Sequence, residues 1–327
     1  MAGSKTYLIN ASSVKYGGAA TILNSFMDWI AQHDSTNQFV LMSSYCPPNL
    51  PSNVRYVEKY TSGMGTLWFC TIGVLYYLIK YRASSCISLS NINLIFPIVK
   101  RITYFHQAKV FVAKDIRFRL MALAIHCLKG STVVVQSPLI KTRFIDKFGG
   151  RYSFLVKWPG IEKVEPQLSS QTNEKLALIK GKTLLWPVTD PYLPQKNLNF
   201  LIKNADWLTT HNVQVLVTSD NHVDHPSFVS IGRLSKADLM ALYREVDGVV
   251  IVSEEETVCL PIFEAAQQGS RVFVLDRPYI RSLEQWRGLP ENVTIIDEIA
   301  AIVLNNTDLA KSNTPDASYF ESDWQIY

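Results

Sequence analysis

Two glutamates eight positions apart are the residues of this chain best placed to do chemistry. Glu256 lies in an acidic turn after an apolar run, and Glu264 lies in a predicted helix that opens at Leu260 and Pro261. Proline suits the first turn of a helix, where its missing N–H would have no partner. A helix N-terminus attracts anions, and a carboxylate just beyond it can accept hydrogen bonds from a ribose diol. The pattern favours a nucleoside diphosphate site; the alternative is a glutamate that stabilises its own helix beside acidic residues that face water.

The elements that must position these glutamates alternate between strands and helices along the chain. Short β-rich runs, the first at Lys5–Ala11, are followed by segments with apolar residues at helical spacing, such as Ala19–Ala31. A polar stretch, 161–181, interrupts the alternation and predicts a linker. Strands and helices that alternate twice over predict two Rossmann-like domains with parallel sheets, and such sheets bind ligands outside the carboxyl ends of their strands. We therefore expect an α/β protein with domains 1–165 and 166–307 facing a central cleft, and a tail, 308–327, free to pack back on the first domain.

The composition excludes several classes of protein. Of the 327 residues, 47% are hydrophobic, which is enough for full cores and excludes a disordered or collagen-like chain. The five cysteines are scattered without a Cys-x-x-Cys pair, which argues against a disulfide scaffold and a structural zinc site. The only other metal-like pattern, His222-x-x-His225, lies in a polar loop, so we expect no metal. Because the N-terminus lacks the apolar segment of a signal peptide, we expect a cytoplasmic protein.

Charge is divided unevenly between the two halves of the chain. Residues 1–165 carry a net charge of +12 and residues 166–327 a net charge of −8. A basic half can face anionic lipid, nucleic acid or phosphorylated ligands, and uneven drift of surface charge is the plainer alternative. The basic half lacks the pattern of a known RNA-binding module, so we expect no nucleic acid partner.

The longest apolar run is Met64–Ile79, closed by Lys80 and Arg82. It falls short of the roughly 20 residues that a spanning helix needs. Its aromatic residues beside two cations are typical of a helix that lies in the membrane interface. A buried core helix and a short membrane anchor are the other interpretations.

Further pieces of sequence surround the two glutamates in a fixed order. Ala265, Ala266, Gly269 and the run RVFVLD follow Glu264. The other pieces are Gly17-Gly18, Tyr104-Phe105-His106-Gln107, Val135-Gln136-Ser137 with Lys141, Trp186-Pro187 with Lys196-Asn197, Ile231-Gly232 with Tyr243, and Asp276-Arg277-Pro278-Tyr279. The ordered set, over roughly residues 5–285, resembles the retaining GT-B glycosyltransferases of family 4, and within them the bacterial branch that builds O-antigen and capsule polysaccharides.

The resemblance implies a role for each matching residue. Glu264 would hold the ribose of the donor nucleotide beside Leu260 and Pro261, and Glu256 would contact the donor sugar near its reacting carbon. Lys196 would neutralise the leaving diphosphate. The Gly17-Gly18 loop would let the backbone approach the diphosphate or the acceptor, because glycine has no Cβ. His106 would lie beside the transferred sugar, which makes Glu256, His106 and Lys196 the implied catalytic residues.

Two positions depart from the family pattern. Many relatives carry an arginine a few residues before the lysine, where this chain has Val188-Thr189-Asp190-Pro191. Arg233 and Arg281 are the candidates for the missing phosphate-binding cation. The glycine usual between the two glutamates is Cys259 here, and its side chain would narrow the donor pocket.

The activity that the resemblance implies is retaining, metal-independent transfer of a hexose from a UDP- or GDP-linked sugar, with no cofactor, to a growing glycan. The acceptor would be a polyprenyl-diphosphate-linked sugar in O-antigen, lipopolysaccharide or capsule synthesis. The basic half and the apolar run at Met64–Ile79 would hold the protein peripherally on the anionic inner leaflet of the cytoplasmic membrane. A GT-B nucleotide-sugar epimerase and an inactive GT-B protein that binds glycan or scaffolds a complex are the alternatives.

Overall fold

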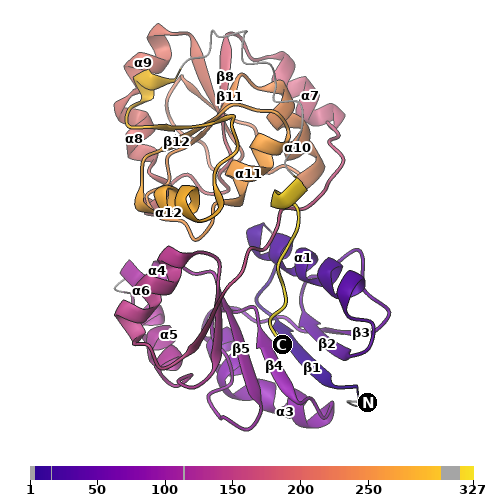
Figure 1. Cartoon of the computed structure of the whole chain (residues 1–327). Coiled ribbons are helices and arrows are strands. Elements are labelled where there is room, and N and C mark those ends of the chain that lie inside the picture. Colours follow the sequence, from indigo (N-terminus) through magenta and orange to yellow (C-terminus); the bar gives the residue numbers. More distant parts are fainter. Residues whose placement is uncertain (1–3, 16, 113–114, 303–316) are drawn as a thin grey trace. The chain divides into compact units, whose positions relative to one another are not determined.

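The computed structural model describes residues 4–15, 17–112, 115–302 and 317–327. Contacts divide the chain into two compact units, Met1–Glu162 with Glu321–Tyr327, and Lys163–Phe320. Within the described residues, seven parallel strands form the sheet of the first unit, in the order β3-β2-β1-β4-β5-β6-β7, and six form the sheet of the second, in the order β10-β9-β8-β11-β12-β13 (Figure 1). The predicted fold class, two α/β domains with parallel sheets, is confirmed.

In the first unit the chain adds strands to both sides of its first strand, β1. Its strands are β1 (Thr6–Ala11), β2 (Gln38–Ser43), β3 (Val54–Glu58), β4 (Ser85–Ser88), β5 (Lys100–Phe105), β6 (Thr132–Val135) and β7 (Ser153–Val156). Its helices are α1 (Gly18–His33), α2 (Gly63–Trp68), the π-helical η1 (Phe69–Gly73), α3 (Val74–Lys80), α4 (Lys109–Val112), α5 (Ile116–His126) and α6 (Pro138–Phe148). Successive side chains of a strand point to opposite faces. Ile9 of β1 therefore packs with Phe26 of α1, and Leu8 packs with Val74 of α3 on the other face.

The end of the chain completes the core of the first unit. The Trp324 ring is fully buried, with its centroid 4.9 Å from that of Phe26 and 4.8 Å from that of Tyr104. The Tyr327 hydroxyl donates a hydrogen bond to Asp34 Oδ2 at 2.9 Å. Residues 321–327 therefore pack on the first unit, whereas residues 308–316 of the tail lie outside the described residues.

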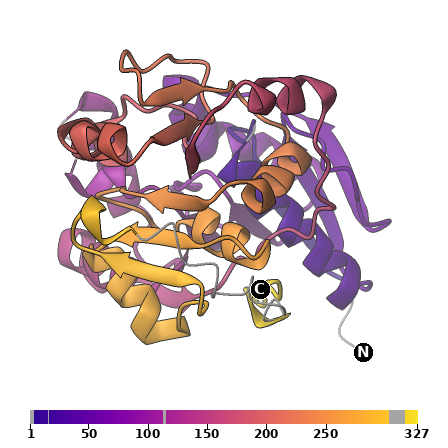
Figure 2. The same cartoon turned by 90° about the horizontal axis from the view of Figure 1, so that it is seen from above.

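The second unit repeats the strand–helix alternation (Figure 2). Its strands are β8 (Lys182–Trp186), β9 (Val213–Val217), β10 (Phe228–Ser230), β11 (Gly248–Ile251), β12 (Val272–Leu275) and β13 (Val293–Ile296). Its helices are α7 (Ser170–Ala177), the 3-10 turn η2 (Pro194–Lys196), α8 (Leu198–Lys203), α9 (Ala205–Thr210), α10 (Lys236–Glu245), α11 (Leu260–Gln267), α12 (Pro278–Arg287), and the 3-10 turns η3 (Ile299–Ala301) and η4 (Ala317–Tyr319). Leu201 and Leu208 of α8 and α9 pack with β8, β9 and β11 residues on one face of the sheet.

The polar stretch expected to be a linker holds helix α7. Ser169 caps this helix by accepting a hydrogen bond from the Thr172 N–H, and the Ser169 N–H donates to Asp238 Oδ1 at 2.7 Å. Most of 161–181 thus belongs to the second unit, which begins at Lys163. The low hydrophobicity of this segment misled the prediction because the helix is held by polar caps and not by a wide apolar face.

Candidate functional site

The second sheet changes direction between β8 and β11, and the candidate site lies there. From β8 the chain adds β9 and β10 on one side, then returns to place β11 on the other side of β8. The loops that leave β8 and β11 therefore diverge at the carboxyl edge of the sheet. Such switch points are where open parallel sheets bind ligands.

Lys196 and Glu256 meet at this switch point. Lys196 ends the η2 turn after β8, Glu256 lies in the loop after β11, and their Nζ and Oε1 atoms are 2.5 Å apart. Both side chains are mostly buried. Burial lowers the pKa of Lys196, but the charge and hydrogen bond of Glu256 outweigh it, so this pKa lies above its usual value. Lys196 is therefore a fixed cation at neutral pH.

Glu254 ties three loops of this edge together. Its carboxylate accepts hydrogen bonds from the Asn197 side-chain amide at 2.7 Å and from Arg277 Nε and Nη2 at 2.5 and 2.8 Å. Its N–H donates to the Gln195 carbonyl at 2.8 Å. Arg277 follows β12, and the hydrogen bonds of Glu254 raise its pKa. Arg277 stands in the Asp276-Arg277-Pro278-Tyr279 piece at the end of a strand, but the sequence prediction did not name it among the candidate phosphate cations.

Glu264 is buried and paired with a lysine that the prediction did not name. Only 5% of its side chain is exposed, and its Oε1 lies 2.5 Å from Nζ of Lys236, the first residue of α10. A buried carboxylate is stable only when it is paired and hydrogen-bonded. Lys236 follows the N-cap Ser235, and that helix start was the one sequence signal that marked its place.

Cys259 is buried and lies between Glu256 and Glu264 in the sequence. It caps α11 in a left-handed conformation, with φ of 49°, which costs a side-chain-bearing residue about 1–2 kcal/mol and glycine almost nothing. Burial raises the pKa of its thiol, Glu256 and Glu264 raise it further, and Lys196 opposes them. The thiol is therefore neutral at pH 7.

The N-terminus of α11 has fewer free backbone N–H groups than a helix N-terminus ordinarily offers to an anion. Pro261 has no N–H, and the Ile262 N–H donates to the Cys259 carbonyl at 3.1 Å. Leu260 and Pro261 do open the helix, as predicted. Lys196, Lys236 and Arg277 supply cationic side chains in this part of the second unit, each paired with a glutamate.

Two buried tyrosines complete the surroundings of Cys259. Tyr243 of α10 and Tyr279 of α12 each have a buried hydroxyl without a hydrogen-bond partner in the described part of the chain. Burial raises the pKa of both, helped by Glu264 at Tyr243 and by Cys259 and Glu256 at Tyr279. Both hydroxyls remain protonated and able to donate.

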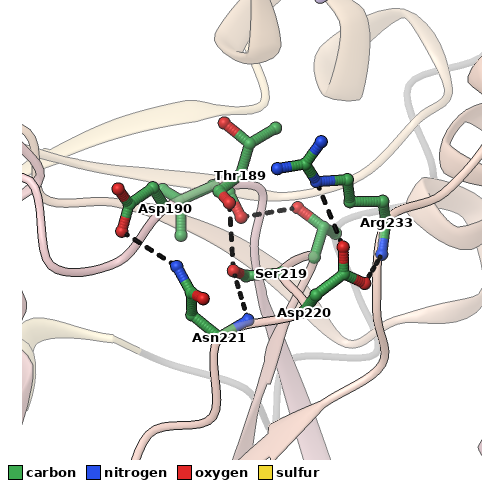
Figure 3. Close-up of polar contacts among 8 residues, drawn as sticks. Thr189, Asp190, Ser219, Asp220, Asn221 and Arg233 are labelled. Carbon is green, nitrogen blue, oxygen red and sulfur yellow. Dashed lines mark hydrogen bonds and ion pairs between the residues drawn. The ribbon is translucent and has the colours of Figure 1, made fainter.

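The two arginines named as candidate phosphate cations are each bound to carboxylates elsewhere. Arg233 follows β10, and its Nε lies 3.2 Å from Asp220 Oδ2 (Figure 3). Figure 3 also shows the neighbouring loops joined by Ser219, which donates to the Thr189 carbonyl, and by Asn221, which donates to Asp190. Arg281 of α12 makes a two-pronged pair with Asp276 and a contact with Glu284.

The carboxyl edge of the first sheet carries the other predicted residues. Gly17 caps α1 with φ of 66°, and a Cβ on Gly17 or Gly18 would meet no atom within 4 Å. His106 follows β5, and its N–H donates to Asn91 Oδ1 at 2.7 Å. Its Nδ1 is buried without a partner among the described residues, and burial lowers the pKa of the ring to about 4. His106 is therefore neutral at pH 7, and its ring can donate or accept a hydrogen bond. A histidine that serves as an acid–base catalyst at pH 7 has a pKa close to that pH.

No metal-binding cluster occurs in the residues that the structure describes. No group of three or more His, Cys, Asp or Glu side chains there is arranged to hold an ion. The His225 ring instead accepts a hydrogen bond from the Ser227 N–H at 3.2 Å.

Comparison with solved structures identifies the fold. WaaG, a glycosyltransferase of lipopolysaccharide biosynthesis, matches with a TM-score of 0.62 at 13% identity over 89% of this chain and 85% of its own. Anabaena Alr3699/HepE, solved with UDP and glucose, matches with a TM-score of 0.60 at 14% identity over 90% and 86% of the two chains. Sucrose-phosphate synthase from Thermosynechococcus elongatus gives 0.61 at 13% identity over 90% and 86%. The fold is that of the GT-B glycosyltransferases.

Comparison by sequence gave no match. No protein-family model matches the chain, and no curated protein matches it.

Proposed function

We propose that this protein is a retaining glycosyltransferase that uses a UDP- or GDP-linked sugar. One observation carries the proposal: Lys196 and Glu256 pair at the switch point of the second sheet, and the loop that holds Glu256 leads directly into α11, where Glu264 is buried. One end of one sheet therefore holds a fixed cation for a diphosphate and two carboxylates for sugar or ribose hydroxyls. The GT-B fold supports this assignment, as does the UDP found in HepE.

Each group has a proposed task that suits its charge. Lys196 and Arg277 stabilise the negative charge that grows on the leaving diphosphate. Glu264 accepts hydrogen bonds from the ribose, and Lys236 pairs with its buried carboxylate. Glu256 faces the donor sugar, and its negative charge favours the positive character that develops on the reacting carbon. In the free protein Lys196 and Glu256 neutralise each other, so the donor replaces one partner of that pair.

The proposed reaction needs neither a metal nor a protein base. The bond between the sugar carbon and the diphosphate oxygen breaks while the acceptor hydroxyl oxygen bonds the same face of that carbon. The hydroxyl proton passes to the leaving diphosphate oxygen. His106 of the first unit is neutral, so no proton transfer is assigned to it.

The acceptor proposal rests on the resemblance and on charge. We assign it to a glycan linked to polyprenyl diphosphate in O-antigen or capsule synthesis, made at the cytoplasmic face of the membrane. The net charge of +12 on residues 1–165 suits a partner with phosphates and a leaflet of anionic lipid.

The first test is thermal stabilisation against a panel of nucleoside diphosphates and their sugars. A ligand at 100 times its Kd raises stability by about 2.7 kcal/mol, so the cognate base stands out. The protein is then incubated with the cognate sugar nucleotide, with and without polyprenyl-linked acceptors, and the products are separated. Transfer gives nucleoside diphosphate only with acceptor present. Interconversion of the free sugar nucleotide would show an epimerase, and binding without turnover across the acceptor panel would show an inactive glycan-binding protein.

A further inference from the structure

A carboxylate and a guanidinium form a pair at the carboxyl ends of β9 and β10. Asp220 follows β9 and Arg233 follows β10. The Arg233 N–H donates to Asp220 Oδ1 at 3.1 Å, and Arg233 Nε lies 3.2 Å from Asp220 Oδ2, so one residue contacts both carboxylate oxygens (Figure 3). The Asp220 side chain is 66% exposed and that of Arg233 is 54% exposed. Because exposed ion pairs add little to stability and these two groups are open to solvent, both are available to a ligand.

The neighbours of Asp220 in the chain hold its carboxylate in place. Ser219 Oγ donates to the Thr189 carbonyl at 3.0 Å, and the Asn221 side-chain amide donates to Asp190 Oδ1 at 3.3 Å (Figure 3). The Asn221 N–H also donates to Ser219 Oγ at 3.0 Å. These contacts join the loop after β9 to the loop after β8 on both sides of Asp220. A binding group that is fixed in this way loses less conformational freedom when a ligand binds.

The Asp220–Arg233 pair lies where the proposed donor would place its base. This step rests on the proposed function, in which Lys196 holds the diphosphate and Glu264 the ribose. Arg233 is three residues before Lys236, whose Nζ lies 2.5 Å from Glu264 Oε1, and three residues span at most about 11 Å. Lys196 lies in the loop after β8, and β9 and β10 follow β8 in the sheet at steps of about 4.8 Å. A nucleotide bound at both places therefore extends its base toward the loops after β9 and β10.

The loop after β10 leaves the Asp220 carboxylate uncovered. Gly232 has a φ of 82°, a conformation that favours glycine, and a Cβ there would lie 3.4 Å from Asp220 Oδ1. The Ile231 carbonyl accepts a hydrogen bond from Lys175 Nζ at 2.7 Å, and the Arg233 N–H is bonded to Asp220. These two backbone groups are engaged within the protein, so a base at this loop would meet the charged side chains of Asp220 and Arg233.

Guanine matches this pair better than the other common bases do. Its adjacent N1–H and N2–H donors can bind the two oxygens of one carboxylate, and its O6 and N7 are acceptors that arginine binds well. Each carboxylate oxygen has two acceptor positions, so the contacts from Arg233 leave a second position on each oxygen of Asp220. Uracil has one N3–H between two carbonyl oxygens, so the other carboxylate oxygen would be repelled. Adenine presents its N1 acceptor to the carboxylate and its N6 donor to the guanidinium, which opposes both charges.

We propose that Asp220 and Arg233 select guanine, so that the donor of this protein is a GDP-linked sugar. The Asp220 carboxylate accepts hydrogen bonds from N1–H and N2–H of the base, and the Arg233 guanidinium donates to O6. This selection rests on the proposed function and narrows its donor from a UDP- or GDP-linked sugar to a GDP-linked one. Both residues determine specificity and take no part in the transfer itself.

The test is calorimetric titration of GDP, inosine diphosphate and UDP into the full chain. Inosine diphosphate differs from GDP only in lacking the N2 amino group, so it loses one of the two hydrogen bonds assigned to Asp220. Wild type is compared with Asp220→Asn and with the matched control Asp224→Asn. Asp224 is an exposed carboxylate four residues further along the same loop, so its substitution removes an equal charge away from the pair. The melting temperature of each protein shows that it is folded.

We expect wild type and Asp224→Asn to bind GDP at least tenfold more tightly than UDP or inosine diphosphate, a difference of about 1.4 kcal/mol. Asp220→Asn should lose this preference, because an amide offers only one acceptor oxygen to the two donors of guanine. Wild type that binds UDP as tightly as GDP, or an Asp220→Asn variant that keeps the preference, would overturn guanine selection and leave the proposed function standing, since a nucleoside diphosphate still binds. If none of the three nucleotides binds wild type, the proposed function is wrong and guanine selection is wrong with it.

Discussion

Removing Lys236 leaves a buried carboxylate without its partner, which makes Lys236→Met the most informative single substitution for stability. Breaking a buried ion pair costs about 3–5 kcal/mol. Lys236 is 27% exposed and Glu264 only 5%, so water screens the lysine partly and we expect the lower end, about 3 kcal/mol. For a unit of this size each kcal/mol shifts Tm by about 2–4 °C. The melting transition of the second unit should therefore fall by about 6–12 °C.

Calorimetry of four proteins measures this effect and isolates the pair. Lys203→Met is the control, because Lys203 is an exposed lysine at the end of α8 and its loss should change stability by less than about 0.5 kcal/mol. The double variant Lys236→Met, Glu264→Gln leaves no unpaired charge and should recover at least half of the loss. If Lys236→Met melts like wild type, or if the double variant is no more stable than Lys236→Met, the pairing of Glu264 does not stabilise the unit as described.

Three further predictions follow from the electrostatics. Arg277→Ala should weaken nucleoside diphosphate binding about tenfold in calorimetric titration, since hydrogen bonds to charged groups are worth about 1.5–3 kcal/mol. The control Arg281→Ala should change this affinity less than about twofold. Equal losses in the two variants would refute the role proposed for Arg277. Burial raises the pKa of Asp238, but hydrogen bonds from Ser169 and Ser235 lower it more, so its stabilisation is present above its usual pKa and lost as pH falls. Asp238→Asn should therefore cost about 1–2 kcal/mol at pH 7, and in urea unfolding this difference should shrink as pH falls below the usual pKa of 3.8; a constant difference would contradict this. Because the pKa of His106 is about 4, the profile of kcat/KM should show no step near pH 6.5 that His106→Asn removes.

The fold was predictable because the spacing of apolar residues along the sequence distinguishes its strands from its helices. Apolar runs such as Val213–Val217 and Val272–Leu275 are too short and too β-branched for helices, and they recur between helical segments. Helices α6 and α12 begin at Pro138 and Pro278, and a proline after a strand is a sequence signal for the start of each. Helix α7 carried no comparable signal, since its position depends on Asp238 from a distant helix.

The site was predictable only in part, because partners depend on packing between elements. Glu256 and Lys196 follow adjacent strands, so their meeting follows once β8 and β11 are known to be neighbours. The pairing of Glu264 with Lys236 depends instead on how α10 and α11 pack on one face of the sheet, which no spacing in the sequence encodes. The carboxylate that each arginine pairs with likewise depends on packing. Arg281, one helical turn beyond Arg277, binds Asp276, whereas Arg277 binds Glu254.

A titration of nucleoside diphosphate into wild type, Lys196→Met and Lys203→Met tests the central claim most directly. We expect wild type and Lys203→Met to bind the cognate nucleotide with equal affinity, and Lys196→Met to bind it at least tenfold more weakly, a loss of about 1.4 kcal/mol. Equal affinity of all three proteins would show that the Lys196–Glu256 end of the second sheet does not hold a diphosphate, and the function proposed for it would be wrong.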